Sequence, residues 1–211
     1  RERISIDKTV AQEEERIKEV REISEADRLK QIAILDAEAR AQQALLEQVQ
    51  AYAANADPMH RKAAMMAFGV SVEGCSEYIR PHMDELWPFV ERGMKDPEVV
   101  VRKAACITLG CLCEMLDEEC AAKHSVFLPI IMELVNDAAT QRAACTALDA
   151  LLEVMGDEIA QYLPAIMERL TGLLETAPVA VKATITGAIG SAAHASREGF
   201  VPYFAPLMQR V

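Results

Sequence analysis

The sequence predicts an all-α fold: a right-handed superhelix of stacked antiparallel helix pairs, preceded by a charged helical segment. The first observation is a nine-residue motif that occurs four times, at residues 61–69, 102–110, 141–149 and 182–190. The copies end at Gly69, Gly110, Asp149 and Gly190, so their spacings are 41, 39 and 41 residues. The second observation is composition, because 51% apolar and 26% charged residues are typical of a folded chain. A period this regular indicates a solenoid, in which each unit contacts its neighbours along the chain.

A period of about forty residues is that of a two-helix HEAT or armadillo unit. The second helix of each unit, here called the B helix, carries the motif and is expected to begin at Asp57-Pro58 and Asp96-Pro97, an N-cap followed by proline at the first helical position. The first helix, the A helix, carries a proline that we place in its first turn. The prolines at these starts are Pro88, Pro129, Pro164 and Pro206. We expect a B helix at 58–75, pairs at 83–119, 126–155 and 163–195, and a further A helix from Pro202.

The motif also predicts how the helices pack. Alanines in its middle, such as Ala64, Ala105 and Ala144, let neighbouring helices approach closely. The leucines that follow them are expected to fill the shared core: Leu109, Leu112, Leu148 and Leu151.

Residues 1–50 differ from the rest, and we place a domain boundary between them and a solenoid at 51–211. They contain no Pro, Gly, Cys or aromatic residue, and 21 of the 50 are charged. Such a segment favours a helix, about 75 Å long if continuous. Its apolar residues recur every third position, which suits a coiled coil poorly because the apolar stripe drifts around the helix. They are Ile17, Val20, Ile23, Ala26, Leu29, Ile32 and Leu35. We expect one or two helices that do not continue the repeat.

The six cysteines are expected to be structural, reduced thiols. Cys106 and Cys145 occupy one repeat position, which points to a packed interface. Cys111 and Cys113 lie two apart on a helix and face different sides, which is poor metal-ligand geometry. The sequence therefore predicts no metal site, and a reducing compartment such as cytosol or nucleus.

Charge and motifs exclude several function classes. A net charge of -11 favours basic partners and argues against nucleic acid, and no apolar run is long enough to span a membrane. The first residues lack both a methionine and a signal-peptide core, so we expect a piece of a longer protein. The chain has no phosphate loop, zinc pair or nucleophile elbow, and its four histidines are scattered. We expect no catalytic site, no cofactor and no enzymatic activity.

Residues 51–211 resemble the central HEAT repeats of nuclear transport receptors of the importin-β superfamily, in particular the importin-four branch, which is similar to the yeast carriers of histones and ribosomal proteins. The matching segments are residues 57–64, 93–97, 101–105, 109–114, 144–149, 162–170 and 188–193. The resemblance implies a fragment of an import receptor that shuttles between cytoplasm and nucleus with basic protein cargo. It places Ran binding in regions outside this chain. Residues 1–50 instead resemble the charged helical stalk of flotillin-type proteins, which leaves open a foreign, engineered segment or a natural spacer helix.

An acidic residue follows the repeat-terminal position by one helical turn in three units, at Glu73, Glu114 and Glu153. In the importin family B helices line the concave cargo surface, so the resemblance implies an acidic strip that receives Lys and Arg side chains. Its candidate members are Glu73, Glu114, Asp117, Asp149, Glu153 and Asp157. His194 stands at the matching position of the fourth unit, where the strip ends or becomes sensitive to pH. The alternative is an ordinary solvated surface.

Asp149 is unusual because it replaces a glycine in mid-helix, where Asp is a poor residue. Either a ligand or a hydrogen bond between repeats is expected to account for it, and a hydrogen bond from Arg142 or Gln141, one or two turns earlier, is the structural alternative.

The resemblance also implies that outer A helices dock phenylalanine-glycine segments of nucleoporins. The local candidates are Trp87, Phe89, Phe127 and Ile131, and the alternative for each is packing inside the repeat. Two functions therefore remain: a receptor for basic cargo, and a structural HEAT scaffold or engineered spacer with no cargo activity of its own.

Overall fold

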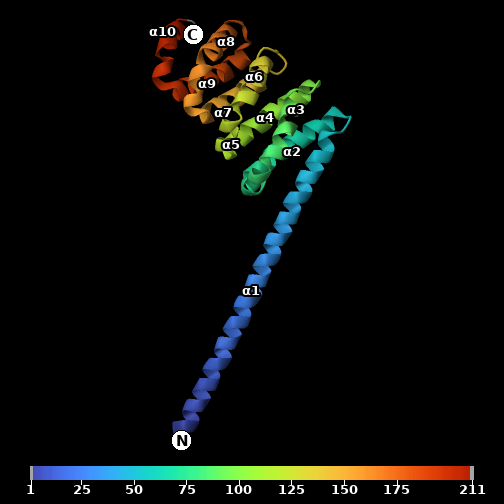
Figure 1. The fold of residues 1–211 in the computed structure, drawn as a ribbon, viewed down its shortest axis with the longest axis vertical. Helices are drawn as coiled ribbons and strands as arrows, with labels where there is room; N and C mark the ends of the chain where they lie inside the picture. Colours follow the sequence, from blue (N-terminus) through green and yellow to red (C-terminus); the bar gives the residue numbers. More distant parts are fainter. Residues whose placement is uncertain (1, 210–211) are drawn as a thin grey trace. The chain divides into compact units, whose positions relative to one another are not determined.

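The computed structural model describes residues 2–209, with the side chains of residues 16–18, 21, 24–25 and 27–209 (Figure 1). Within residues 2–209 every regular element is a helix, so the predicted all-α class is confirmed. The chain divides into two units, Arg1–Leu45 and Leu46–Val211. The sequence placed this division near residue 50.

The first unit is one helix. Helix α1 runs over Glu2–Ala53, and its last residues belong to the second unit. Its described apolar side chains are largely open to solvent, with Ile17 50%, Leu29 62% and Leu35 54% exposed. Val20, Ile23 and Ala26, which belong to the same predicted stripe, lie outside the described side chains. Residues 2–45 therefore owe their helix to local propensity more than to a buried face among the described side chains.

The second unit is a stack of helix pairs in chain order, in which short 3₁₀ turns or the short helix α5 join successive pairs. Its α-helices are α2 (Pro58–Ile79), α3 (Met83–Met94), α4 (Val99–Met115), α5 (Asp117–Ala122), α6 (His124–Leu134), α7 (Gln141–Val154), α8 (Leu163–Thr176), α9 (Val179–Ser196) and α10 (Val201–Met208). The 3₁₀ turns are η1 (Arg80–His82), η2 (Gly156–Gln161) and η3 (Arg197–Phe200). These bounds follow the predicted pairs closely.

The helices form two layers. The B helices α2, α4, α7 and α9 pack on one another in sequence, and each of the A helices α3, α6 and α8 packs on the B helix that follows it. Residues 46–53 at the end of α1 stand in for the A helix before α2, where Val49 is buried. We call the closely packed B layer the inner layer and the A layer the outer layer.

The motif supplies the core between these layers. Ala64, Ala105 and Ala144 are buried, so small side chains lie where B helices meet. The four predicted core leucines, Leu109, Leu112, Leu148 and Leu151, are all fully buried. Both packing predictions are confirmed, and the buried leucines make the hydrophobic burial that holds the stack together.

Of the two predicted N-caps, one is confirmed and one is wrong. Asp57 does cap α2 by accepting a hydrogen bond from the Met59 amide at 2.9 Å. Asp96 does not cap α4: it accepts from the Glu98 amide in a turn, and the helix starts at Val99. Its carboxylate instead accepts hydrogen bonds from Arg61 of the preceding unit.

The A-helix prolines were placed too early in their helices. Only Pro164 lies in a first turn, while Pro88, Pro129 and Pro206 lie inside α3, α6 and α10. These helices begin about a turn before the proline, which then interrupts one backbone hydrogen bond without ending the helix.

Candidate functional site

The predicted acidic strip lies on consecutive inner helices. Glu73 is on α2, Glu114 on α4 and Glu153 on α7, and all three side chains are exposed. Because these helices pack side by side and the residues share a repeat position, the three carboxylates repeat along the inner layer. Asp157, in η2, is exposed as well, and so is His194 on α9.

The pKa of the Cys111 thiol is affected by the charges of two of these acids. Cys111 is half-buried on α4, and burial raises the pKa of its thiol, helped by the negative charges of Glu114 and Glu73. Residues on α4 and α2 therefore act on one thiol. Negative potential from adjacent units overlaps here, which is what a lysine side chain needs for stable contact.

Asp117 is less available than its exposure suggests. Arg80, at the end of α2, forms an ion pair with Glu119 of α5 at 2.5 Å. The pKa of Arg80 is raised above its ordinary value by that hydrogen bond to Glu119, with smaller contributions from Glu77 and Asp117. A resident cation therefore already offsets part of the negative charge around Asp117.

Asp149 has a partner inside the protein. Its Oδ1 accepts a hydrogen bond of 2.5 Å from the Ser191 hydroxyl of α9, which ties two inner helices together. The expected hydrogen bond between units is present, but its donor is neither Arg142 nor Gln141. The Gln141 amide donates to the Val135 carbonyl at 3.1 Å instead. A half-buried, hydrogen-bonded Asp149 is a weaker candidate for a ligand than its exposed neighbours.

The repeat-terminal glycines explain why an aspartate fits there. A Cβ added at Gly69 would lie 3.1 Å from the Cα of Thr108, whereas Gly110 and Gly190 have nothing within 4 Å. Only the first copy is crowded, so the third copy can carry Asp149.

Sequence reasoning missed a set of ion pairs that we call rungs. Arg61 on α2 binds Asp96, in the loop before α4, through two hydrogen bonds of 2.7 and 2.8 Å. Arg102 on α4 binds Asp137, in the loop before α7, at 3.2 Å. In both pairs the arginine and the aspartate are 35 residues apart in the sequence. An Arg at the first motif position together with an Asp 35 residues later was a signal that the sequence carried.

Each rung arginine also holds the loop of its own unit. Arg61 donates to the Asn55 and Ala56 carbonyls, and Arg102 donates to the Asp96 and Pro97 carbonyls. One guanidinium therefore joins the loops of two successive units, using the several donors that arginine offers in a fixed geometry.

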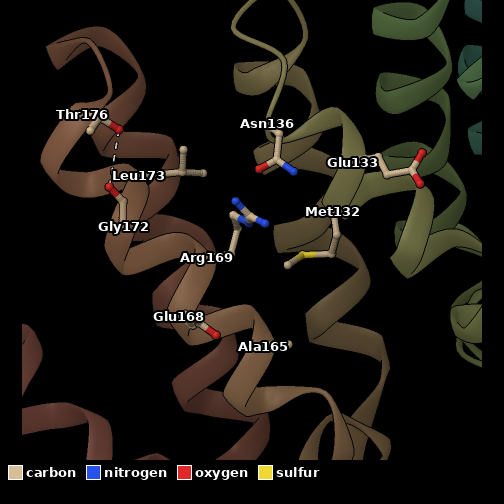
Figure 2. A pocket seen from close by; sticks show the side chains of 9 residues that line it. All are labelled: Met132, Glu133, Asn136, Ala165, Glu168, Arg169, Gly172, Leu173 and Thr176. Carbon is tan, nitrogen blue, oxygen red and sulfur yellow. Dashed lines mark hydrogen bonds between the residues drawn. The ribbon is translucent and has the colours of Figure 1, made fainter.

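The outer layer carries grooves between successive A helices. One of them, about 600 Å³, lies between α6 and α8 and is lined by Met132, Glu133, Asn136, Ala165, Glu168, Arg169, Gly172, Leu173 and Thr176 (Figure 2). A second, about 200 Å³, lies between the end of α1 and α3, and a third, about 150 Å³, between α8 and α10. In Figure 2 the Arg169 side chain reaches into the space between α8 and α6. These grooves were not predicted.

The four aromatic and aliphatic candidates for nucleoporin binding are interior residues. Trp87, Phe89, Phe127 and Ile131 are all 6% exposed or less. The Trp87 and Phe127 rings pack in a tilted arrangement, with centroids 5.4 Å apart, and join α3 to α6. Phe89 packs on Phe68 and also lines the groove beside the end of α1. In this structure Trp87, Phe127 and Ile131 pack inside the repeats, which was the alternative given for each of them.

The cysteines are thiols in packed positions. Burial raises the pKa of Cys106 to about 12 and that of Cys145 to about 11, and the hydrogen bond with Cys113 together with burial raises that of Cys120. Reactive cysteines need a lowered pKa, so these thiols are structural. Nowhere among the described side chains do three or more His, Cys, Asp or Glu gather as metal ligands. The helices of residues 2–209 all lack an apolar stretch of the length that spanning a bilayer requires.

An α-solenoid with an acidic inner layer is thus the class that fold and site define. A family model described as a HEAT-like repeat matches residues 58–112 and 138–192. The probable importin subunit beta-4 of Schizosaccharomyces pombe is 36% identical over 164 residues, which are 76% of this chain and 15% of that protein. Human transportin-1 is 25% identical over 115 residues, 52% of this chain and 13% of that protein.

Solved structures agree on the fold. The crystal structure of Kap121p matches with a TM-score of 0.73 at 23% identity, over 77% of this chain and 16% of that one. The chain therefore belongs to the HEAT-like repeat family, with repeats of the importin-β karyopherin kind. It spans less than a fifth of the length of these relatives. The relatives are importins and transportins, which are transport receptors and not enzymes.

Proposed function

We propose that this chain is the cargo-binding part of a nuclear transport receptor, which holds lysine-rich protein segments on its inner layer. The observation that carries this proposal is the exposed acid at one repeat position on three consecutive inner helices, Glu73, Glu114 and Glu153. A net charge of -11 adds long-range attraction for basic partners. Histone tails and ribosomal proteins are the cargo class that this chemistry favours.

The relatives support the proposal through what they bind. Kap121p has been crystallised with the SUMO protease Ulp1p, with Nup53p and with Pho4p. Another structure is a Kap121p variant with three acidic residues, about one repeat apart, replaced by lysine. Three acids of Kap121p at a repeat spacing were thus chosen for charge reversal, and Glu73, Glu114 and Glu153 have a similar spacing here.

Passage through the nuclear pore requires a second surface. Nucleoporin phenylalanine-glycine segments would enter the outer grooves, one of which Phe89 already lines. An aromatic ring buried in such a groove contributes mainly through its apolar area. Ran would bind regions outside this chain, and the receptor would shuttle between cytoplasm and nucleus.

The test is binding of a fluorescent lysine-rich histone-tail peptide, followed by anisotropy at low and moderate salt. The double charge reversal Glu114→Lys with Glu153→Lys should weaken binding by about tenfold or more, because it converts two attractive contacts into repulsive ones. Both side chains are exposed, so the melting temperature should change little. Affinity of the parent chain should fall as salt rises.

The matched control reverses two exposed acids of the outer layer, Glu85→Lys on α3 with Glu133→Lys on α6. This variant has the same net charge as the first. Equal losses in both variants would mean that total charge alone attracts the peptide. In that case, or if the parent chain does not bind, the structural scaffold is the better account of these repeats.

A further inference from the structure

The rungs follow a fixed spacing, which identifies the place of the next one. Arg61 pairs with Asp96 and Arg102 pairs with Asp137, each 35 residues apart. Gln141 takes the place of the arginine in the third unit, and Thr176 lies 35 residues after it. Thr176 precedes the N-cap residue of α9 by two residues, as Asp96 precedes the N-cap residue of α4.

This third rung is missing. Gln141 carries no charge, and its amide turns back to the Val135 carbonyl of its own unit. Thr176 donates its hydroxyl to the Gly172 carbonyl of its own helix at 3.4 Å (Figure 2). At each of the two earlier junctions, an ion pair joins the loops of the two neighbouring units. No such ion pair joins the loop before α7 to the loop before α9.

The groove between α6 and α8 opens at the same junction. It separates α6 from α8, and Thr176 is one of the residues that line it. At the preceding junction the packed rings of Trp87 and Phe127 connect α3 to α6. Here Met132 and Leu173 face the groove, and both remain only partly buried. At this junction the absent rung therefore coincides with an open groove in the outer layer.

The inner layer at this junction is tied. Asp149 of α7 accepts the 2.5 Å hydrogen bond from Ser191 of α9, and a Cβ at Gly187 would lie 3.4 Å from the Asp149 carboxylate. A contact that holds on one side and a gap that opens on the other have the geometry of a hinge.

We propose that the solenoid bends at the junction between α6–α7 and α8–α9, pivoting on the Asp149–Ser191 side, with the α6–α8 groove opening and closing. The two earlier junctions, each closed by a rung, move as a more rigid block. The inference depends on the rungs and the groove and not on any cargo. Bending would let the inner layer adjust its curvature to partners of different shape.

Pulsed electron-electron resonance between spin labels tests this directly. In a chain whose half-buried Cys75 and Cys111 are replaced by serine, one label pair is Ala138→Cys with Ala180→Cys, across the missing rung. The matched pair is Val100→Cys with Ala138→Cys, across the Arg102–Asp137 rung. All three sites are exposed. The first distance distribution should be about twice as broad as the second.

Two variants then decide whether rungs control the motion. Gln141→Arg with Thr176→Asp rebuilds the missing rung and should narrow the first distribution, while neither single change should. Asp137→Asn removes an existing rung and should broaden the second. Equal widths in the parent chain, or no response to either variant, would overturn the proposal.

Discussion

The inner and outer layers of the solenoid are built from the same repeat but solve different packing problems. Inner helices carry alanines at their crossings and bury Leu109 and Leu148 completely, so they form one continuous layer. Outer helices carry prolines and large rings, touch each other at few points, and leave grooves between α6 and α8 and between α8 and α10. Small side chains allow close approach over a whole helix, while bulky ones make contact only where they interlock.

The difference also separates the two kinds of surface. Charges on the inner layer repeat with the units, because a continuous layer presents each repeat position in the same way. The outer layer presents cavities, whose size depends on which side chains happen to fill each gap. The inner layer is therefore suited to recognise a partner by its charge. The outer layer is suited to recognise a partner by its shape.

The largest expected effect on stability compares leucines of the two layers. Leu148→Ala, in the inner core, should cost about 3 kcal/mol, because the side chain is fully buried and leaves a cavity. Leu173→Ala, at the outer groove, should cost about 1 kcal/mol, because the groove is already open. Urea unfolding of both variants checks this. Similar losses would contradict the view that the inner layer carries most of the stability.

The second effect concerns how the stability contributed by the Arg61–Asp96 rung depends on pH. The Arg61 guanidinium, hydrogen-bonded to Asp96, lowers the pKa of that carboxyl below its ordinary value. A lowered pKa stabilises the fold above the ordinary pKa of about 4, and this contribution is lost as pH falls through the lower folded-state value. Asp96→Asn should therefore melt at a lower temperature than the parent at pH 7.

The gap between the Asp96→Asn variant and the parent should then shrink as the solution is acidified below about pH 4. Glu98→Gln, two residues away and exposed, serves as the control and should lower the melting temperature at pH 7 less than Asp96→Asn does, because Arg61 makes its two hydrogen bonds to Asp96. A gap that stays constant with pH would show that the rung does not act through the charge of Asp96.

The smallest effect compares two glycines at one repeat position. Gly69→Ala should destabilise by about 1 kcal/mol, since the new Cβ meets Thr108, whose hydroxyl is fixed by a 2.7 Å hydrogen bond to the Met65 carbonyl. Gly110→Ala should stabilise by up to about 1 kcal/mol, because the helix gains propensity and the space is free. Thermal melts of both variants check the two signs, and a stabilised Gly69→Ala would mean that helices α2 and α4 can shift apart within the inner layer.

Periodicity made most of the fold predictable. A motif returning every 39 to 41 residues identified the pairs, and the Asp57-Pro58 start of α2 was placed correctly because capping is a local effect. Asp96 was misassigned because a cap and a rung require the same residue type at nearly the same place. Only the position of the neighbouring unit distinguishes them.

Partners across units were harder to predict than positions within a unit. The place of Asp149 in mid-helix indicated that it has either a ligand or a hydrogen-bond partner, but the partner found, Ser191, is 42 residues away and belongs to the next helix of the layer. The outer grooves could not be predicted, since they depend on which gaps rings such as Trp87 and Phe127 fill. Composition does not fix that choice.

The central claim is that a lysine-rich segment lies on the acidic inner layer, and its contact map tests this most directly. A histone-tail peptide carrying a photoreactive benzophenone would be cross-linked to the chain and the attached residues identified by mass spectrometry. We predict attachment to the exposed faces of α2, α4 and α7 around Glu73, Glu114 and Glu153, reduced by added salt. Attachment centred instead on Met132 and Leu173 in the outer groove, unchanged by salt, would contradict the claim.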